Sequence, residues 1–492
     1  MKHTYLIILA LLFTFLKAQA QNEGDTLFNA AYIHDVHMTF NQVSYWDSLI
    51  ATHTTDNYIE GTVSIDGYVI GTCGVKTKGN SSFNNSSTKK SFKVDMNEFV
   101  SGQNFEGLKK INLNNGFKDP TFLREKLTLD FYQQHGMAAP RCTFARVYLN
   151  GIYWGLYSLV EEIDNKTFLD SRFNSSAGNC FKGDPNGDLR WLGATPSLYY
   201  PKYELVTNEF LNDWTDLVRL INTISNSGSN FHDSLEAVFN TSSFISQWAM
   251  YNVFSNFDSY LGSGHNYYIY HNSITDKFEW MAWDVNESFG TFRQGLTATQ
   301  ILNMSYAYVP TQAGSRPLIQ NMIADPVYNN ALADTICNWI QYDFSNAALN
   351  RKIDSLANVV RTDVYADTRK FYSNQDFETN LTSDIVGVFG LKSFISARRN
   401  TLLTELSSRC ATPVSTLDGR TNFILYPQPA QERVTIIYPL DKPTMLNVYN
   451  SIGSKLLEQL LVNESTEVDL STLAAGIYFI EINNSVKKLL VQ

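Results

Sequence analysis

Two neighbouring stretches, "NFDSYLGSGHNYYIY" (Asn256–Tyr270) and "WMAWDVNESFG" (Trp280–Gly290), combine strand-like aromatic runs with acids and amides. Asp258, Asn266 and Asp284 follow one another in them as an acid, an amide and a second acid. The oxygen atoms of these side chains suit a hard cation such as Mg²⁺. They also suit a purely structural role, with Asp258 in a turn and the other two hydrogen-bonded at strand ends. The rest of the chain has to distinguish the two interpretations.

Length, charge and the first residues set the class of protein. A chain of 492 residues predicts one large domain and a smaller one, and a formal net charge of −10 argues against general nucleic-acid binding. Residues 1–20, "MKHTYLIILALLFTFLKAQA", have the basic start, short apolar run and Ala-Gln-Ala end of a signal peptide. No later apolar run approaches the roughly 20 residues that span a bilayer, so we expect an exported chain without a transmembrane segment.

The pattern of apolar residues predicts an α+β protein with a mainly β front lobe and a mainly α rear lobe. Asp66-Gly67 and Asn150-Gly151 are hairpin turns between alternating runs. We expect further strands at Lys89–Met96 and Lys109–Asn115, and a helix at Pro120–His135. Helical spacing then dominates from about Leu205, with the two strands of the opening stretches embedded in it. The five cysteines form no CxxC pair, and their spacing does not reveal a disulfide pairing.

Familiar hydrolytic and nucleotide signatures are absent from the sequence: it has no HExxH, no Gly-x-Ser-x-Gly and no Walker loop. What remains suits nucleotide phosphates and magnesium. "KTKGNSS" (Lys76–Ser82) ends a hairpin with small residues that bring backbone N–H groups close to an anion, and Lys93 follows on the next strand. An acid, an amide and an acid is also the order of the catalytic and metal-binding residues of protein kinases.

Five ordered blocks resemble the CotH family, spore-coat protein H and its relatives, over roughly Ala31–Arg409. The blocks are "VKTKGNSS…KKSFKV", "INLNNGFKDPTFLREKLTLDFYQQHGMAAPRCTFARVYLNGIYWGLYSLVEEID", "CFKGDP", "NFDSYLGSGHNYYIYHN" and "FEWMAWDVNESFG". The resemblance implies an atypical protein-kinase-like two-lobed fold and Mg²⁺-assisted transfer of the γ-phosphate of ATP to Ser/Thr hydroxyls of extracellular or surface proteins. It implies Asp258 as the catalytic acid, with Asp284 and Asn266 as the metal ligands.

The nucleotide-binding residues are less sharply assigned. Lys93 fits the kinase-like strand position, and Lys78 beside Gly79 competes with it. Glu125 fits a glutamate that pairs with that lysine, although an exposed acid in a first helical turn would look the same. Glu161, at the junction of the lobes, is expected where adenine would lie. The chain departs from the family in having Lys78 where Arg is frequent and Asn286 where a second acid is common.

The last part of the chain has evenly spaced short strands, which predicts a small all-β sandwich at 422–492. It resembles the type A C-terminal sorting domain of the type IX secretion system through "YPQPA", "YNSIGSKL", "LAAGIYFIEI" and the terminal "KKLLVQ", with Gln428 in place of the usual Asn. The expected organisation is therefore a signal peptide (1–20), a CotH-like kinase domain (21–410), a linker (411–421) and the sorting domain. The type IX secretion machinery is the expected partner, and the expected location is secreted or attached to the outer cell surface.

A non-catalytic interpretation stays open. ATP is scarce outside cells, and losing an acid at Asn286 would weaken a second metal site. A pseudokinase that serves as a surface adhesin or as a matrix- or glycan-binding protein would keep the fold without phosphate transfer. Heat from Mg-ATP binding would distinguish the two alternatives.

Overall fold

A computed structural model of the chain describes residues 23–28, 32–163, 166–310, 316–410, 423–426, 430–438, 440, 442–450, 454–474, 476–482 and 485–491. The chain divides into two compact units, Met1–Cys410 and Ala411–Gln492. The expected signal peptide (1–20) and linker (411–421) lie outside the described residues. Among the residues described, no helix has the length and apolar character needed to cross a membrane.

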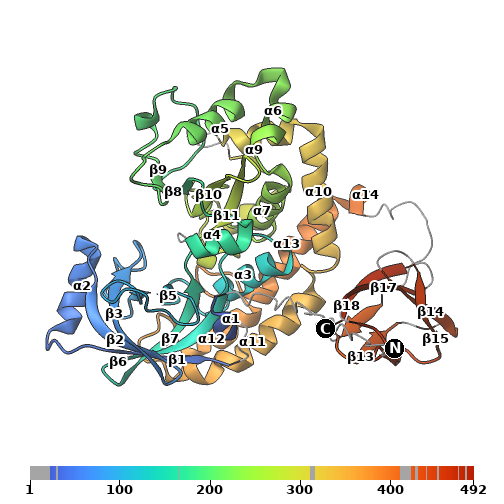
Figure 1. Ribbon diagram of the computed structural model, residues 1–492, viewed down its shortest axis with the longest axis horizontal. Coiled ribbons are helices and arrows are strands. Elements are labelled where there is room, and N and C mark those ends of the chain that lie inside the picture. The colour runs from blue at the N-terminus through green and yellow to red at the C-terminus, as the bar shows by residue number, and fades with distance from the viewer. Residues whose placement is uncertain are drawn as a thin grey trace, which may run out of the picture. The chain divides into compact units, whose positions relative to one another are not determined.

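The first unit begins with a closed seven-stranded barrel, ordered β1-β2-β3-β4-β5-β7-β6 (Figure 1). Both predicted hairpin turns are present, and their residues have the positive φ angles that the sequence indicated: 49° and 82° at Asp66-Gly67, and 48° and 77° at Asn150-Gly151. The strands are β1 (His34–Thr39), β2 (Ile59–Ile65), β3 (Tyr68–Lys78), β4 (Ser91–Asp95), β5 (Lys110–Asn114), β6 (Cys142–Leu149) and β7 (Ile152–Glu161).

Alternate residues of these strands point into the barrel and form its own apolar core, which includes Val36, Val75, Val94 and Leu113. The helices beside the barrel are α1 (Asp25–Phe28), α2 (Tyr45–Thr55) and α3 (Arg124–Gln134). α3 begins later than the predicted Pro120, because Phe122 has φ 61° and because the Asp119 carboxylate accepts from the Arg124 amide at 2.8 Å. The turn before α3 is therefore not helical.

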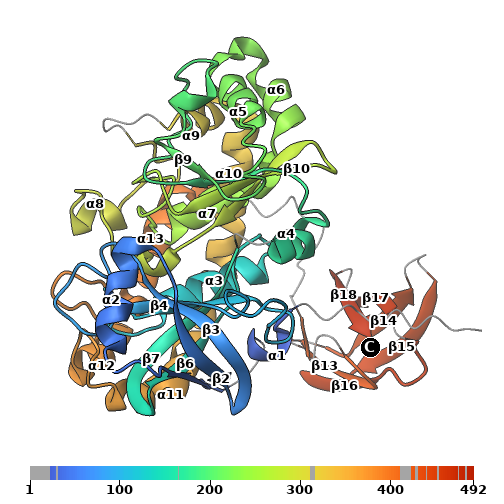
Figure 2. The same cartoon turned by 60° about the vertical axis from the view of Figure 1, so that its left-hand side comes forward.

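A four-stranded sheet, ordered β11-β10-β8-β9, follows the barrel, and α3 lies between the two in both views (Figures 1 and 2). Its antiparallel β10–β11 hairpin carries the aromatic runs of the opening stretches. The elements of this part are α4 (Lys166–Phe173), β8 (Cys180–Gly183), η1 (Pro196–Leu198), β9 (Tyr203–Leu205), α5 (Thr215–Asn226), η2 (Gly228–Asn230), α6 (Phe231–Val238), α7 (Thr241–Val253), β10 (Tyr267–Asn272), β11 (Lys277–Ala282) and η3 (Val285–Glu287).

Helices dominate after Gly290, as predicted. They are α8 (Ala298–Leu302), α9 (Pro317–Ala324), α10 (Pro326–Gln341), α11 (Asn346–Ala366), α12 (Asn374–Thr382), α13 (Leu391–Glu405) and α14 (Ser407–Cys410). A disulfide joins Cys337 of α10 to Cys410 of α14, with a Cα–Cα distance of 5.4 Å. The other three cysteines, Cys73, Cys142 and Cys180, are buried thiols. The unit is thus a mixed α+β structure.

The described residues of the second unit form two antiparallel sheets around a separate apolar core, as a small sandwich does. One sheet is ordered β12-β13-β16 and the other β15-β14-β17-β18. The strands are β12 (Ile424–Tyr426), β13 (Arg433–Ile437), β14 (Thr444–Asn450), β15 (Lys455–Leu461), β16 (Ser465–Asp469), β17 (Gly476–Ile482) and β18 (Ser485–Val491).

Candidate functional site

Asp258 lies in the turn that follows α7, and its carboxylate is held by three neighbours. Oδ1 lies 2.5 Å from His265 Nε2 and accepts from Ser263 Oγ at 3.2 Å. Asn266 Nδ2 donates to Oδ2 and to the Asp258 carbonyl, each at 3.0 Å. The Asn266 amide nitrogen is therefore occupied, and among the described residues no donor is bonded to its oxygen. The structure brings the first acid and the amide together.

Asp284 stands at the open end of the β10–β11 hairpin, beside this turn. The Trp283 amide donates to the Asn266 carbonyl at 3.2 Å, which brings the residue after β11 next to the residue before β10. Asp284 then adopts a left-handed conformation with φ 48° and ψ 59°. Such backbone geometry in a residue other than glycine carries strain and clusters at functional sites.

The Asp284 carboxylate is open to solvent, and within the described part of the chain it makes no hydrogen bond or ion pair. Desolvation by the surrounding protein raises its pKa, the Lys78 charge opposes that rise and the Asp258 charge adds to it. The protein thus holds an acid without a direct partner near a second acid. A cation placed there would remove this cost.

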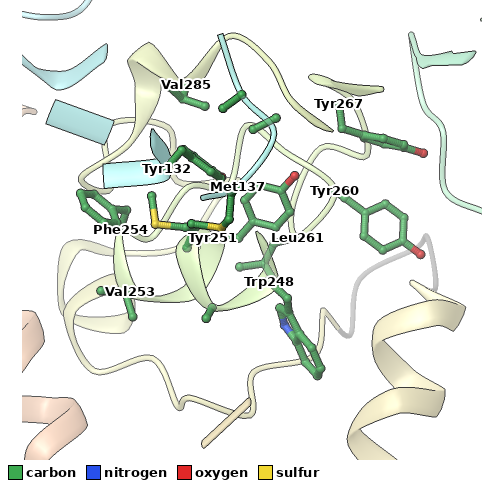
Figure 3. Close-up of a cluster of buried hydrophobic side chains, with 14 of the residues drawn as sticks. Tyr132, Met137, Trp248, Tyr251, Val253, Phe254, Tyr260, Leu261, Tyr267 and Val285 are labelled. Carbon is green, nitrogen blue, oxygen red and sulfur yellow. The ribbon is translucent and has the colours of Figure 1, made fainter. Parts of the chain in front are cut away.

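Apolar anchors fix the three polar residues in place. Figure 3 shows Tyr260, Tyr267 and Val285 among the buried side chains of the main core. Tyr267 directly follows Asn266, Val285 directly follows Asp284, and Tyr260 comes two residues after Asp258. All three anchors are at most 1% exposed. Close packing of these neighbours restricts where each polar side chain can lie.

Lys78 reaches the same place from the end of β3. Its Nζ donates to Asn112 Oδ1 at 3.0 Å and to Asn114 Oδ1 at 3.2 Å. It also lies 5.1 Å from the ring centroid of Trp283, the residue before Asp284. Burial lowers the pKa of Lys78, and the charges of Asp284 and Glu162 counteract that effect. The barrel therefore presents this amine toward the hairpin that carries Asp284.

Lys93, the other candidate lysine, is engaged differently. On β4 it faces Lys76 rather than Lys78 across the β3–β4 ladder, and its Nζ forms an ion pair with Glu162 at 2.6 Å. Asn112 Nδ2 donates to the same Glu162 carboxylate at 3.3 Å, so the two lysines are connected through one amide. Burial tends to raise the pKa of Glu162. The Lys93 charge and the hydrogen bonds from Lys93 and Asn112 outweigh that effect and lower the pKa to about 2.

Glu161, which we expected near adenine, faces the other way from Glu162. It forms ion pairs with Arg141 at 2.5 Å and with Arg172 at 3.2 Å. Neighbouring residues of an extended strand point to opposite sides, so only one of the two acids can join the lysine network. That acid is Glu162, which the sequence analysis did not single out.

Glu125 is buried, at 4% exposure, which rules out the interpretation as an exposed first-turn acid. Its Oε1 accepts from Asn114 Nδ2 at 2.8 Å, and Asn114 also binds Lys78. Burial raises the pKa of Glu125 above its ordinary value, as does the Asp284 charge, while Lys78 lowers it. Asn114 therefore links Glu125 to Lys78, which differs from the direct lysine–glutamate pair that the sequence predicted.

Gly79 directly follows Lys78 and has φ 89°, a conformation that favours glycine. A Cβ at this position would come within 2.1 Å of Ser82 Oγ. The Gly79 carbonyl lies 2.8 Å from His53 Nε2. The residue therefore allows the tight turn that the sequence predicted after β3.

Sequence reasoning missed two further groups beside the acids. His265 contacts Asp258; burial lowers its pKa, but the hydrogen bond and charge of Asp258 raise it above the ordinary value. Glu287 binds Lys118 Nζ through both oxygens at 2.9 Å, and burial raises its pKa to about 7 despite that ion pair. The adjacency of His265 to Asn266 was the one available signal for the histidine.

Within the described residues, no three His, Cys, Asp or Glu side chains are arranged to enclose a metal ion. A cation at Asp284 would therefore take most of its ligands from water or from a bound substrate. Mg²⁺ is usually held in this way, by one or two carboxylates together with waters and phosphates.

Comparisons with known proteins agree with the two units. The sequence matches the family described as CotH kinase protein over residues 75–402, which is more than half of the chain, and the protein belongs to the CotH family. Residues 424–492 match the secretion system C-terminal sorting domain. This domain supports the predicted type IX secretion route and indicates secretion or attachment to the cell surface.

Three curated relatives are similar over parts of the chain. Inner spore coat protein H of Bacillus subtilis (strain 168) is 25% identical over 297 residues, covering 59% of this chain and 76% of that protein. Invasin CotH3 of Rhizopus delemar is 21% identical over 376 residues, covering 69% of this chain and 61% of the invasin. Invasin CotH2 of the same fungus is 21% identical over 263 residues, covering 51% of this chain and 44% of that invasin.

Proposed function

We propose that this protein is a secreted, atypical protein kinase that transfers the γ-phosphate of ATP to Ser or Thr hydroxyls of extracellular or surface proteins. The observation that carries the proposal is the solvent-open Asp284 carboxylate, which has no hydrogen-bond partner in the described residues and lies in the field of Lys78 and Asp258. The surrounding protein desolvates this carboxylate enough to raise its pKa, although the group remains accessible to solvent. An acid kept in this state suits a cation that arrives with a substrate.

The residues present fit a magnesium nucleotide. Asp284 offers carboxylate oxygens and Asn266 offers its amide oxygen, because the amide nitrogen is already bonded to Asp258. Both are hard oxygen ligands of the kind that Mg²⁺ prefers. Lys78, with Gly79 next to it, supplies a positive charge and a tight backbone turn for phosphate oxygens.

When bound, the nucleotide would supply the transferable phosphoryl group, and its Mg²⁺ would neutralise part of the phosphate charge. Asp258 would orient the acceptor hydroxyl and take its proton. His265, Ser263 and Asn266 hold this carboxylate in one orientation. Lys78 would offset negative charge on the phosphates, and Asn114 links it to Glu125. Positioning and charge compensation are the main contributions that a protein makes to phosphoryl transfer.

Asp258→Asn tests the catalytic assignment. The variant keeps the size of the side chain but removes the base, so we expect phosphate transfer from labelled ATP to fall by about 10²–10⁴-fold. The measurement is incorporation of label into a protein acceptor such as casein, at saturating Mg²⁺. Asp216→Asn is the matched control, because Asp216 is a half-buried acid of α5 that contacts His271 of β10 and lies away from this group. Equal activity of wild type and Asp258→Asn would reject the assignment.

A non-catalytic adhesin is the second candidate, and two relatives named invasins favour it. In that case the chain would keep the CotH fold and bind a surface partner without phosphate transfer. An adhesin should show no magnesium-dependent nucleotide binding, so the same purified chain distinguishes the two functions.

A further inference from the structure

A cavity of about 330 Å³ adjoins the turn that carries Asp258. The described residues that line it come from the β8–β9 connection, from the turn after α7, from Gln294 before α8, and from Tyr308, Pro310 and Arg316 before α9. Its volume lies at the small end of the range for ligand pockets, so it suits a side-chain-sized group rather than a whole nucleotide.

The cavity is connected to the candidate catalytic acid through Ser263. Ser263 lines the cavity, and its Oγ donates to Asp258 Oδ1 at 3.2 Å. Phe257, which directly precedes Asp258, lines it as well. If the hydroxyl of a substrate polypeptide reached Asp258, the residues next to that hydroxyl would therefore lie within reach of this cavity. The lysine network reaches Asp284 instead, from the barrel.

The lining carries an excess of positive charge. Among the described lining residues the one carboxylate is that of Asp188, which is buried and is shared by Lys202 at 2.8 Å and Arg190 at 3.4 Å. Arg316 adds a third cation, which is 4% exposed and donates to the Tyr260 carbonyl at 2.7 Å and to the Gly262 carbonyl. Three cations against one acid stand out in a chain whose net charge is −10.

Arg190 is the cation best placed to meet an incoming group. Its side chain is 41% exposed, whereas that of Lys202 is 20% exposed. The single Asp188 carboxylate cannot neutralise both cations. A guanidinium with spare N–H donors binds a carboxylate through charge-assisted, often bidentate, hydrogen bonds.

We propose that this cavity binds an acidic side chain next to the acceptor hydroxyl, so that the protein selects Ser or Thr in acidic polypeptide segments. This inference rests on the proposed kinase function for the acceptor, but the binding of the acidic group stands on the cavity alone. Arg190 makes the first contact, and Lys202 and Arg316 supply the favourable field behind it.

Peptide binding to the full chain tests the proposal. The probes are three fluorescein-labelled peptides at 150 mM salt: Gly-Glu-Glu-Ser-Glu-Glu-Gly, the same peptide with Gln for Glu, and the same with Lys for Glu. We expect fluorescence anisotropy to give an affinity about fivefold or more higher for the acidic peptide than for the Gln peptide. Arg190→Gln should remove this difference, Arg190→Lys should retain part of it, and Arg190→Glu should favour the Lys peptide.

Arg351→Gln is the matched control, because it removes the same charge from an exposed position of α11 that does not line the cavity. The inference is overturned if the acidic peptide binds no better than the Gln peptide. It is also overturned if Arg190→Gln and Arg351→Gln weaken binding equally, since that result reports general charge attraction. Preference for the acidic peptide without any phosphate transfer would support the cavity assignment and reject the kinase function. Phosphate transfer without a preference for the acidic peptide would support the kinase function and reject the cavity assignment.

Discussion

Two charged sites in the first unit are built in opposite ways, one buried and one open to solvent. Lys89, just before β4 of the barrel, forms an ion pair with Asp367, which directly follows α11, and neither side chain is exposed. Asp367 also accepts from the Leu156 amide at 3.1 Å and from the Arg369 amide at 2.9 Å. Asp284, by contrast, makes no hydrogen bond within the described residues. The fully bonded pair holds the fold together. The unbonded acid is accessible to solvent, and desolvation and the Asp258 charge raise its pKa, so a cation beside it would be favourable.

The largest expected effect is at the bonded pair. Lys89→Met leaves the Asp367 charge buried and uncompensated, and should lower the free energy of unfolding by about 3–5 kcal/mol. Urea denaturation of the purified chain measures this value. Lys76→Met, which breaks a pair with the exposed Asp56, should cost less than about 1 kcal/mol. Similar losses in both variants would remove the contrast between buried and exposed pairs.

The second effect concerns pH and the site acids. Glu287 has its pKa raised by burial from 4.5 to about 7, so the folded state holds its proton more tightly than the unfolded state. The stability it contributes is complete below pH 4.5 and is lost as the pH rises through 7, by an amount on the order of 3 kcal/mol.

Glu287→Gln cannot lose a proton, so it isolates this contribution. The stability of the wild type relative to the variant should fall between pH 4.5 and pH 7.5, when both are measured by urea denaturation. A stability difference that stays constant over this range would show that Glu287 is ionised throughout and that the site does not raise its pKa.

The smallest effect distinguishes the two lysines. Within the described part of the chain Lys78 donates its hydrogen bonds to amide oxygens, whereas Lys93 forms an ion pair with Glu162. Lys78→Met should therefore weaken binding of Mg-ATP about tenfold, the amount expected for one charge-assisted contact. Lys93→Met should weaken it less and should mainly lower the melting temperature, because Glu162 loses its partner. The reverse order of nucleotide affinities would assign the nucleotide to Lys93.

Local sequence signals predicted much of the fold. The Asp-Gly and Asn-Gly turns need positive φ at both positions, and the structure has it at both. The structure also places the acid, the amide and the second acid of the opening stretches near one another, whereas their catalytic and metal-binding roles stay a prediction. The start of α3 was not predictable, because it depends on the positive φ of Phe122, for which the sequence carries no signal.

The details of the site depended on tertiary packing. Glu162, and not Glu161, joins the lysines because its side of the chain faces Lys93 at the end of β7. The sequence cannot reveal this choice, since it shows only two adjacent acids. The choice between Lys78 and Lys93 depends in the same way on the register of β3 and β4. Sequence therefore identified the elements of the site but not the partners of each side chain.

Isothermal titration of ATP into the full chain, with and without Mg²⁺, tests the central role of Asp284 most directly. We expect magnesium-dependent binding by the wild type that Asp284→Asn weakens by at least about tenfold, together with a melting temperature for the variant that is unchanged or higher. Magnesium-dependent binding that survives intact in Asp284→Asn, or a variant that loses stability, would contradict the account.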